Sequence, residues 1–318
     1  MEKSEILEII SKSYNLGKIS SLKKFDAKNV RSQKWKFQNQ SEKFLVTRIQ
    51  ENVDPRRMEK ILKIQNLCVK KKLPIQNPIK NNNKKFFNNK NYFYITTYYK
   101  GELYKGTKPQ ILNISKKLAI LHRYFKKSKI NEENLNLKNY NLLSQNEIKK
   151  ILKQKPIFKV DNIIQKDLEF INELILKQKN QKRKINFLSK QLIHNDLHPR
   201  NVLFKNSNVK VILDFNSMKF GYRMEDLVLT SFRFANFYEN EEKKIERNIR
   251  VFIENYLKWN KIPKKEINLY NYFLKEYLLT RISHIIRNRF ILNNDVWLKD
   301  YSMFMKFMNK AKKITYED

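Results

Sequence analysis

Three oxygen-bearing side chains are spaced along the second half of this chain in a pattern that suggests chemistry. Asp196 and Asn201 lie five residues apart in the segment His194–Asn201. Asp214 follows the apolar run Val209–Leu213. One carboxylate, a nearby amide and a second carboxylate after a hairpin are the groups needed to move a phosphoryl group from ATP to a hydroxyl. The spacing therefore predicts a phosphoryl-transfer site.

Each of these residues has a distinct predicted role. Asp196 is the candidate catalytic base, because a carboxylate can orient a hydroxyl and take its proton as the new bond forms. Asn201 and Asp214 are the candidate magnesium ligands, since Mg²⁺ prefers hard oxygen donors. His194 and His198 are predicted to support the loop, although His198 could instead face the phosphate. Asp and Asn are also ordinary turn residues, but the ordered set favours the catalytic reading.

The strong positive charge has two readings. Lys and Arg number 67 against 31 Asp and Glu, so the formal net charge is +36. One reading is a polyanionic partner such as RNA, DNA or an acidic membrane surface. The other is compositional drift, because Lys, Asn and Ile are all abundant, there are only 4 glycines, and the basic residues are scattered. We favour the second reading and expect no nucleic-acid partner, although a nucleoside triphosphate is itself an anion.

Compartment and size follow from simpler features. The first residues are charged and no long apolar segment follows them, which argues against a secretory signal. The apolar run Tyr92–Tyr99 is too short to span a bilayer. The single cysteine, Cys68, suits a reducing compartment. We expect a cytoplasmic protein of two domains or one bilobal domain, and we leave its oligomeric state open.

The hydrophobic periodicity indicates which elements position these residues. Residues 2–13 have the spacing of an amphipathic helix, and a longer helix is expected from Asp54-Pro55 to about Lys72. The predicted strands are 19–25, 34–38, 43–49 and 92–99, the last of them central in its sheet. Beyond residue 106 the predicted elements are helices at 111–125, within 145–185 and within 224–318, together with a small β region at 191–216.

This order predicts two lobes. A β-rich part with one helix, residues 1–99, precedes a helical part, residues 100–318, and a connector near residues 98–105 joins them. The loops that carry Asp196 and Asp214 belong to the second part. Ligands are expected in the cleft between the two parts.

Three motifs resemble those of a known family. His194–Asn201 is similar to the catalytic loop of the aminoglycoside phosphotransferase and choline kinase superfamily of small-molecule kinases, in which Asn195 replaces the Arg usual in protein kinases. Leu118–His122 resembles the Leu-Ala-x-Leu-His helix of these enzymes, and Asp226 resembles the Asp that steadies the metal-binding loop. The resemblance extends over roughly residues 15–290. It implies an α+β, bilobal protein-kinase-like fold with a small β-rich N-lobe and a larger helical C-lobe.

The resemblance also implies where nucleotide binds. Arg48 occupies the position of the basic strand residue that grips the phosphates, and Glu59 is its expected salt-bridge partner. The adenine would pack against the connector Tyr98, Tyr99, Lys100. The loop 26–32 has no glycine, so Asn29 and Ser32 are the expected phosphate-loop residues. The implied cofactors are ATP, with GTP left open, and Mg²⁺.

The acceptor pocket is expected from the helical part. Arg233, Arg281, His284, Trp297 and Tyr301 are the candidate acceptor-binding residues, although such positions also occur on solvated faces or in cores. We expect a small metabolite with a free hydroxyl: a sugar, an amino alcohol such as choline, or a hydroxy amino acid such as homoserine. The alternatives are an antibiotic kinase of the aminoglycoside type, a catalytically idle module that binds RNA or anionic membrane, and a protein kinase. The missing activation segment argues against the last.

Overall fold

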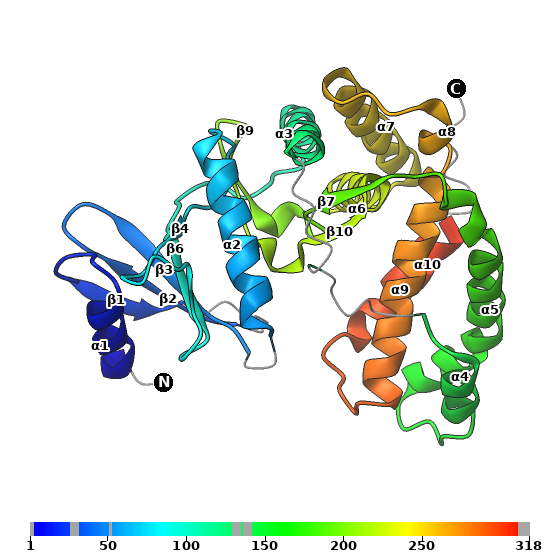
Figure 1. Ribbon diagram of the computed structural model, residues 1–318. Coiled ribbons are helices and arrows are strands. Elements are labelled where there is room, and N and C mark those ends of the chain that lie inside the picture. The colour runs from blue at the N-terminus through cyan, green and yellow to red at the C-terminus, as the bar shows by residue number, and fades with distance from the viewer. Residues whose placement is uncertain (1–2, 26–31, 51–52, 129–134, 136–141, 311–318) are drawn as a thin grey trace.

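A small antiparallel sheet and a larger group of helices form the two parts of the protein (Figure 1). The computed structural model describes residues 3–25, 32–50, 53–128, 135 and 142–310. In this range, no helix is long and apolar enough to cross a membrane. The last long strand of the sheet ends at Thr97 and the next helix begins at Lys108. The division of the chain at residues 99 and 100 agrees with these bounds and stays a prediction.

The sheet has the order β1-β2-β3-β6-β4, and β5 also pairs with β6. Its strands are β1 (Ser21–Lys24), β2 (Gln33–Gln38), β3 (Lys43–Arg48), β4 (Pro78–Ile79), β5 (Phe87–Asn88) and β6 (Phe93–Thr97). β6 is buried along most of its length and has partners on both sides, as its continuous apolar sequence predicts. All pairings are antiparallel.

Two helices cover the sheet. The helix α1 (Lys3–Ser13) buries Ile6 and Ile10 in a cluster with inward-facing residues of β2, β3 and β6. The helix α2 (Pro55–Lys70) begins where Asp54 accepts a hydrogen bond from the Arg56 N–H at 2.9 Å. Both helices agree with the periodicity of the sequence. α2 belongs to the main core and lies between the sheet and the helical part (Figure 1).

The larger part is mainly helical. Its helices are α3 (Lys108–Lys127), α4 (Gln145–Leu152), α5 (Lys159–Gln181), α6 (Arg223–Ala235), α7 (Glu242–Trp259), α8 (Lys264–Ile267), α9 (Tyr270–Phe290) and α10 (Tyr301–Lys310). α3 packs on α7, while α6 packs on both α7 and α9. Their buried residues form one continuous hydrophobic cluster that also includes α2.

Two short two-stranded sheets carry the loops of Asp196 and Asp214. β7 (Lys190–Ile193) pairs with β10 (Lys219–Tyr222), and β8 (Val202–Lys205) pairs with β9 (Asn208–Ile212). The predicted β region ends at residue 216, so it does not include β10. β10 has only four residues and pairs with a strand far back in the chain, so its own sequence shows no alternation to detect. A Cβ on Gly221 of β10 would lie 2.9 Å from Ile193 Cδ1, which shows how closely the two strands approach.

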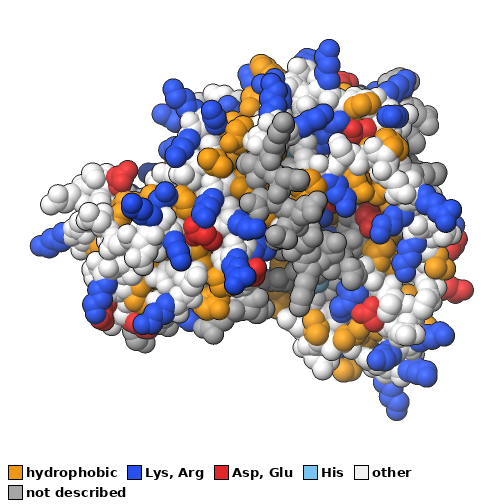
Figure 2. Space-filling view, in the orientation of Figure 1, with side chains coloured by type: hydrophobic (Ala, Val, Ile, Leu, Met, Phe, Trp, Pro, Cys, Tyr) orange, Lys and Arg blue, Asp and Glu red, His pale blue; other side chains and the backbone are white. Residues whose placement is uncertain are grey.

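Lys and Arg side chains are scattered over the described part of the face shown in Figure 2. They occur on the sheet part as well as on the helical part and are interspersed with apolar and acidic side chains. A nucleic-acid surface would be expected to show a continuous stripe or patch of basic groups. On this face, the distribution fits the compositional reading of the net charge.

Candidate active site

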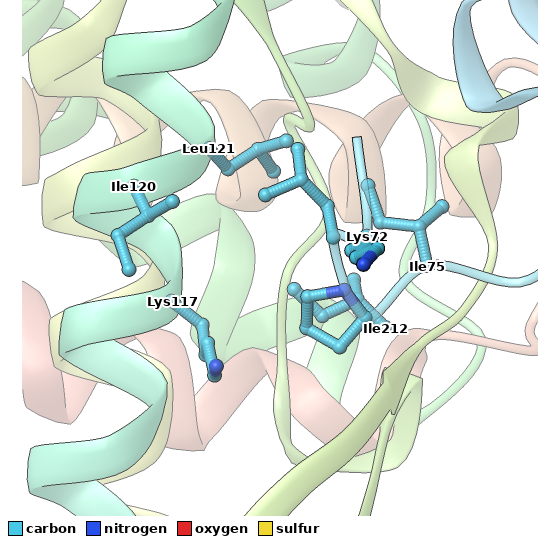
Figure 3. Close-up of a pocket in the computed structure, with 8 residues that line it drawn as sticks. Lys72, Ile75, Lys117, Ile120, Leu121 and Ile212 are labelled. Carbon is cyan, nitrogen blue, oxygen red and sulfur yellow. The ribbon is translucent and has the colours of Figure 1, made fainter. Parts of the chain in front are cut away.

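One pocket of the structure lies apart from the predicted site residues. It lies between the end of α2 and α3 and is lined by Ile75, Ile120, Leu121, Ile212 and neighbouring residues, with Lys72 and Lys117 at its edge (Figure 3). Its lining contains no carboxylate and no residue predicted to bind nucleotide or acceptor. The pocket therefore offers no groups for phosphoryl transfer.

Asp196 and Asp214 lie on two neighbouring loops. Asp196 follows β7, and Asn201 ends the short 3₁₀ turn η3 (Pro199–Asn201). The Asn201 Nδ2 donates to the Asp196 backbone oxygen at 2.9 Å, which fixes the amide against the loop. The Leu213 N–H donates to the Asn201 backbone oxygen at 2.8 Å, so the residue before Asp214 is tied to the same turn. The three predicted residues are thus brought together by direct backbone and side-chain contacts.

The charge of Asp214 acts on the Asp196 carboxylate. Burial raises the pKa of Asp196, Arg281 opposes the rise, and the negative charge of Asp214 adds to it. Asp214 has a left-handed backbone with φ of 57°, and its carboxylate accepts from the Asn216 N–H at 3.4 Å. The geometry therefore concentrates negative charge between the two loops.

This concentration of charge fits a bound divalent cation. In the part of the chain that the structure describes, no group of three His, Cys, Asp or Glu side chains forms a metal centre. The oxygen donors here are instead the Asp214 carboxylate and the Asn201 amide. Mg²⁺ is usually coordinated by about one or two protein oxygens when phosphate oxygens and waters complete its coordination shell. The residues present fit magnesium held together with a nucleotide.

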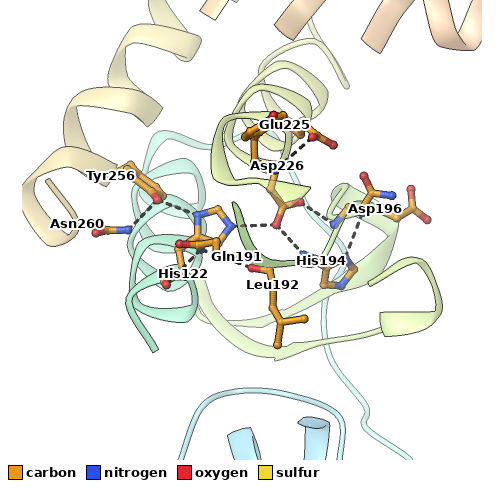
Figure 4. Close-up of polar contacts among 11 residues, drawn as sticks. His122, Gln191, Leu192, His194, Asp196, Glu225, Asp226, Tyr256 and Asn260 are labelled. Atoms are coloured by element: carbon orange, nitrogen blue, oxygen red, sulfur yellow. Dashed lines mark hydrogen bonds and ion pairs between the residues drawn. The ribbon is translucent and has the colours of Figure 1, made fainter. Parts of the chain in front are cut away.

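A buried hydrogen-bond network holds the loop of Asp196 (Figure 4). Asp226 of α6 is fully buried, and its two carboxylate oxygens accept from the His194 and Asn195 backbone N–H groups, each at 2.8 Å. The His122 Nε2 lies 3.0 Å from Asp226 Oδ2, and the His122 Nδ1 lies 2.8 Å from the Tyr256 hydroxyl. Helices α3, α6 and α7 thus jointly position the loop.

The network explains why Asp226 stays charged inside the core. Burial alone would raise its pKa, but the hydrogen bond and charge of His122 and the backbone N–H of His194 hold the pKa below its usual value. Asn195, whose backbone N–H also donates to Asp226, has a φ of 63°. A non-glycine residue in this region needs support from its surroundings. Asp226 supplies that support through two backbone N–H groups.

Replacing Asp226 with Asn should lower the free energy of unfolding by about 3 kcal/mol or more, since one partner of a buried ionic network is removed. The new amide NH₂ would point at a backbone N–H of His194 or Asn195 and leave that donor unsatisfied. Urea unfolding of the variant checks this result. Asp295→Asn is the matched control, because this exposed carboxylate contacts Arg289 and should change stability by at most about 1 kcal/mol. Equal effects of the two substitutions would remove the support role of Asp226.

Both loop histidines contact the loop that carries Asp196. The Asp196 N–H donates to His194 Nδ1 at 3.3 Å, and the opposite ring nitrogen, Nε2, lies 3.0 Å from the Leu213 backbone oxygen. His194 therefore bridges the two loops. His198 Nδ1 accepts from the Arg200 N–H at 3.2 Å, and its Nε2 lies 3.8 Å from Asp196 Oδ2. Burial, followed by the charge of Arg233 and other nearby cations, lowers the pKa of His198 to about 3, so it is neutral at pH 7.

The sheet contributes one face to this site. The Tyr94 hydroxyl of β6 donates to Asn216 Oδ1 at 3.2 Å, just after Asp214. Arg57 of α2 is buried, and its Nη2 donates to the backbone oxygens of Asn216 and Met218 at 2.9 and 2.8 Å. These contacts tie the Asp214 loop to the N-terminal part. Sequence analysis missed both residues, because an apolar strand position and a helix arginine carry no local signal of their partners.

The strand register bears on the predicted phosphate clamp. Thr47 of β3 lies opposite Tyr94, so it shares the face that reaches Asn216. Arg48 lies opposite Phe93, whose side chain belongs to the cluster under α1 on the other face. Side chains alternate strictly along a strand. The predicted contact of Arg48 with phosphate stays a prediction, and the register argues against it.

A different lysine shares the face of Tyr94. Lys34 of β2 lies opposite Thr47. The next residue on this face, Lys36, has its ammonium 4.3 Å from the centre of the Tyr98 ring. Lys34 therefore shares with Lys36 and Lys43 the sheet face that contacts the Asp214 loop through Tyr94. Of these lysines, Lys34 is the one in register with Thr47 and Tyr94. The sequence pattern alone did not single it out, because one lysine among many is uninformative without the register.

Glu59 has other partners than the predicted one. Its Oε2 accepts from the backbone N–H groups of Phe86 and Phe87 at 3.0 and 2.9 Å, and its Oε1 lies 3.8 Å from Lys63 Nζ. These contacts hold β5 against α2. The predicted pair of Glu59 with Arg48 stays a prediction that these contacts do not support.

The connector is attached to both parts. The Tyr98 N–H donates to the Lys43 backbone oxygen at 2.7 Å, and Lys210 Nζ donates to the Lys100 backbone oxygen at 2.6 Å. Tyr99 is half-buried, and burial raises its pKa. A Cβ on Gly101 would lie 2.8 Å from Leu203 Cβ, so only glycine lets the connector approach β8 this closely. Ser32 is half-buried just before β2, and Asn29 lies outside the described residues.

Of the predicted acceptor residues, Arg281 and Arg233 act on Asp196, whereas His284, Tyr301 and Trp297 have other contacts. Arg281 Nη2 lies 3.9 Å from Asp196 Oδ1, and the charge of Arg233 also acts on Asp196. His284 is buried on α9 and contacts Asn288 one turn later. The Tyr301 hydroxyl donates to Asp167 of α5 at 2.8 Å, and Trp297 packs on the main core. Tyr301 is therefore placed as a core residue rather than as an acceptor-binding residue, because its ring is buried and its hydroxyl is bound to α5.

Comparisons with known proteins place this geometry in context. A family model described as a phosphotransferase enzyme family matches residues 26–248. A comparison with curated protein sequences gives no match. A crystal structure of spectinomycin phosphotransferase with ADP and spectinomycin superposes with a TM-score of 0.73 at 14% identity, covering 99% of this chain and 98% of that one.

Two further structures have the same arrangement. An amicoumacin kinase in complex with AMP-PNP, Ca²⁺ and its ligand gives a TM-score of 0.71 at 11% identity, covering 100% of this chain and 96% of that one. Choline kinase from Streptococcus pneumoniae gives 0.62 at 11% identity, covering 96% and 98%. At these identities the likeness concerns the fold. It confirms the predicted bilobal α+β, protein-kinase-like fold.

Proposed function

The chain belongs to the phosphotransferase enzyme family, and from this premise we propose that it transfers the γ-phosphoryl group of ATP to a small metabolite with Asp196 as the base. Family membership makes it a small-molecule phosphotransferase that acts on a hydroxyl group. Two structural neighbours support the use of a nucleotide and a divalent metal: one structure contains ADP, and the other contains AMP-PNP and Ca²⁺. ATP rather than GTP, and magnesium as the metal, are our proposals.

The proposed roles follow from the positions of the side chains. Asp196 accepts a hydrogen bond from the acceptor hydroxyl, orients it and takes its proton. Asn201 and Asp214 would hold magnesium, which when bound offsets the charge that develops on the phosphate oxygens. His194 keeps both loops in register through its contacts with Asp196 and Leu213. Asp226 maintains the loop conformation on which this alignment depends.

A single observation carries the proposal most directly. Asn201 is hydrogen-bonded to the backbone of Asp196, and the residue before Asp214 is hydrogen-bonded to Asn201. A base and two oxygen ligands are therefore held by one continuous set of contacts. An idle module that binds RNA or membrane would have no need to keep this set, and its basic groups would be expected to gather in a patch.

The antibiotic alternative remains a second candidate because two neighbours are a spectinomycin phosphotransferase and an amicoumacin kinase. The two candidates differ in the acceptor and share the chemistry. Phosphorus NMR of the protein with ATP, Mg²⁺ and pools of hydroxyl compounds tests both. Acceptor-dependent formation of a phosphate ester with ADP supports phosphotransfer. A protein that binds nucleotide but converts no metabolite and no antibiotic would contradict it.

Replacing Lys34 with Ala should raise the KM for ATP about 10-fold, because a charged contact to phosphate contributes about 1.5 kcal/mol. Arg48→Ala should change this KM less, since the register directs Arg48 to the opposite face. Initial rates against ATP concentration give both values. Lys24→Ala is the matched control for loss of one positive charge, because Lys24 is exposed on β1 and lies opposite Trp35, on the other face of the sheet. A larger effect of Arg48→Ala than of Lys34→Ala would restore Arg48 as the phosphate clamp.

A further inference from the structure

Three side chains from two packed helices form a basic acceptor site beside the proposed base. Arg233 lies on α6, while Tyr277 and Arg281 lie one turn apart on α9. Arg233 Nη1 donates to the Tyr277 hydroxyl at 3.1 Å. The Arg281 guanidinium carbon lies 5.7 Å from the centre of the Tyr277 ring. Tyr277 therefore holds two guanidinium groups next to one another.

The basic acceptor site adjoins Asp196 directly. Arg281 Nη2 lies 3.9 Å from Asp196 Oδ1. Burial would raise the pKa of Tyr277, but the charges of Arg233 and Arg281 outweigh it and lower that pKa. The pair of guanidinium groups around Tyr277 therefore adjoins the proposed base through Arg281.

This arrangement has a clear preference for the charge of a ligand. A guanidinium group presents parallel N–H donors that match the two oxygens of a carboxylate or the oxygens of a phosphate. A cationic acceptor would have to approach Asp196 past two groups of its own charge. Cation binding usually uses an exposed aromatic face. Here Arg281 lies over the Tyr277 face, so a ligand cation would compete with a cation of the protein.

We infer that the acceptor is a hydroxyl-bearing organic anion whose carboxylate or phosphate ester is bound by Arg233 and Arg281 while its hydroxyl faces Asp196. This inference rests on the proposed function. In the reaction the hydroxyl oxygen bonds to the γ-phosphorus of ATP, the bond from that phosphorus to the bridging oxygen breaks, ADP leaves, and Asp196 takes the proton. The inference selects a hydroxy acid or a phosphorylated alcohol. It argues against choline and against polycationic antibiotics.

Compounds that share a carbon skeleton and differ in one terminal group, and so in charge, test the inference. Glycerate, glycerol and 3-amino-1,2-propanediol share a three-carbon skeleton with hydroxyls but are anionic, neutral and cationic, and glycerol 3-phosphate supplies the phosphate arm. Their binding to the protein loaded with ADP and Mg²⁺ is measured by calorimetry. We expect one of the two anions to bind at least about 10-fold more tightly than glycerol, and the amine to bind most weakly. The preferred anion identifies carboxylate or phosphate as the recognised group.

Variants connect the preference to the two arginines. Arg281→Gln and Arg233→Gln should each reduce the anion preference about 10-fold, and Arg281→Lys should restore part of it, because lysine keeps the charge but not the fork. Arg247→Gln is the control and should leave the preference unchanged, because Arg247 is an exposed residue of α7. Equal or tighter binding of the amine, absence of anion binding, or a preference that survives both Gln substitutions would overturn the inference.

The same measurements separate this inference from the proposed function. Anion binding that depends on the arginines, without ATP consumption for any hydroxyl compound, would keep the basic acceptor site and reject phosphotransfer. ATP-dependent phosphorylation of a neutral or cationic acceptor, without anion binding, would keep phosphotransfer and reject the anionic acceptor.

Discussion

Asp196→Asn should lower kcat by about 10³-fold, within the range that a positioned general base contributes. The amide cannot take the hydroxyl proton, although it keeps the size of the side chain. The contacts that hold the loop use the backbone N–H and oxygen of Asp196, so they survive the substitution. We therefore expect an unchanged melting temperature and a KM for ATP within about 3-fold of the original value, because the lost interaction belongs to the transition state.

The measurement is the steady-state release of ADP with a saturating acceptor. Asp300→Asn is the matched control, since it makes the same chemical change in the short turn η5 (Leu298–Asp300), at the start of α10. A kcat for Asp196→Asn similar to that of the control would mean that another group takes the proton. A large rise in the KM for ATP with little change in kcat would instead assign Asp196 to nucleotide binding.

The loops that carry the chemistry could be predicted from the sequence because their signals are local. Asp196 and Asn201 are five residues apart, and Asp214 follows a strand whose apolar character is visible in the sequence. The helix starting at Asp54-Pro55 was likewise predicted from a capping residue and a proline. Each of these signals is contained in a few neighbouring residues. The structure adds the contacts that hold them together, such as Asn201 to the Asp196 backbone.

The sheet face of the site could not be predicted in the same way. The sequence predicts a strand over residues 43–49 that contains Thr47 and Arg48, but it does not show which of these two residues faces the helical part. That choice is set by the pairing of β3 with β6, and a shift of one residue exchanges the faces. Likewise, Lys34 can be assigned to the face of Thr47 only when the pairing of β2 with β3 is known. Strand register depends on the pairing of distant segments and cannot be read from a single sequence.

The candidate acceptor-binding residues also could not be sorted from the sequence alone, because their proximity depends on helix packing. Arg233 and Arg281 are far apart in sequence, and their joint action on Asp196 follows from the packing of α6 on α9. Trp297 and Tyr301, one turn apart, gave an equally good local pattern. Tyr301 is instead buried, with its hydroxyl bound to Asp167. Local spacing cannot separate an acceptor pair from a core pair, because both need aromatic side chains on one side of a helix.

Asp214→Asn should also lower kcat by about 10³-fold, since a carboxylate that would hold magnesium at the transition state is replaced by a neutral amide. Asn is the appropriate replacement because Asp214 has a φ of 57°, a conformation that Asn tolerates better than Ala. The Asn side-chain oxygen can also still accept from the Asn216 N–H. The fold of the loop should therefore be retained, and any loss of turnover can be assigned to the charge.

The dependence on magnesium distinguishes this role from that of Asp196. For Asp214→Asn, the magnesium concentration at half-maximal rate should rise about 10-fold or more, because one of two protein oxygens loses its charge. For Asp196→Asn, it should stay within about 3-fold of the original value, since that residue acts on the acceptor proton. Rates measured over a magnesium series at saturating ATP give both values. If the two variants showed the same magnesium dependence, Asp214 would not be the metal ligand, and the negative charge between the loops would need another explanation.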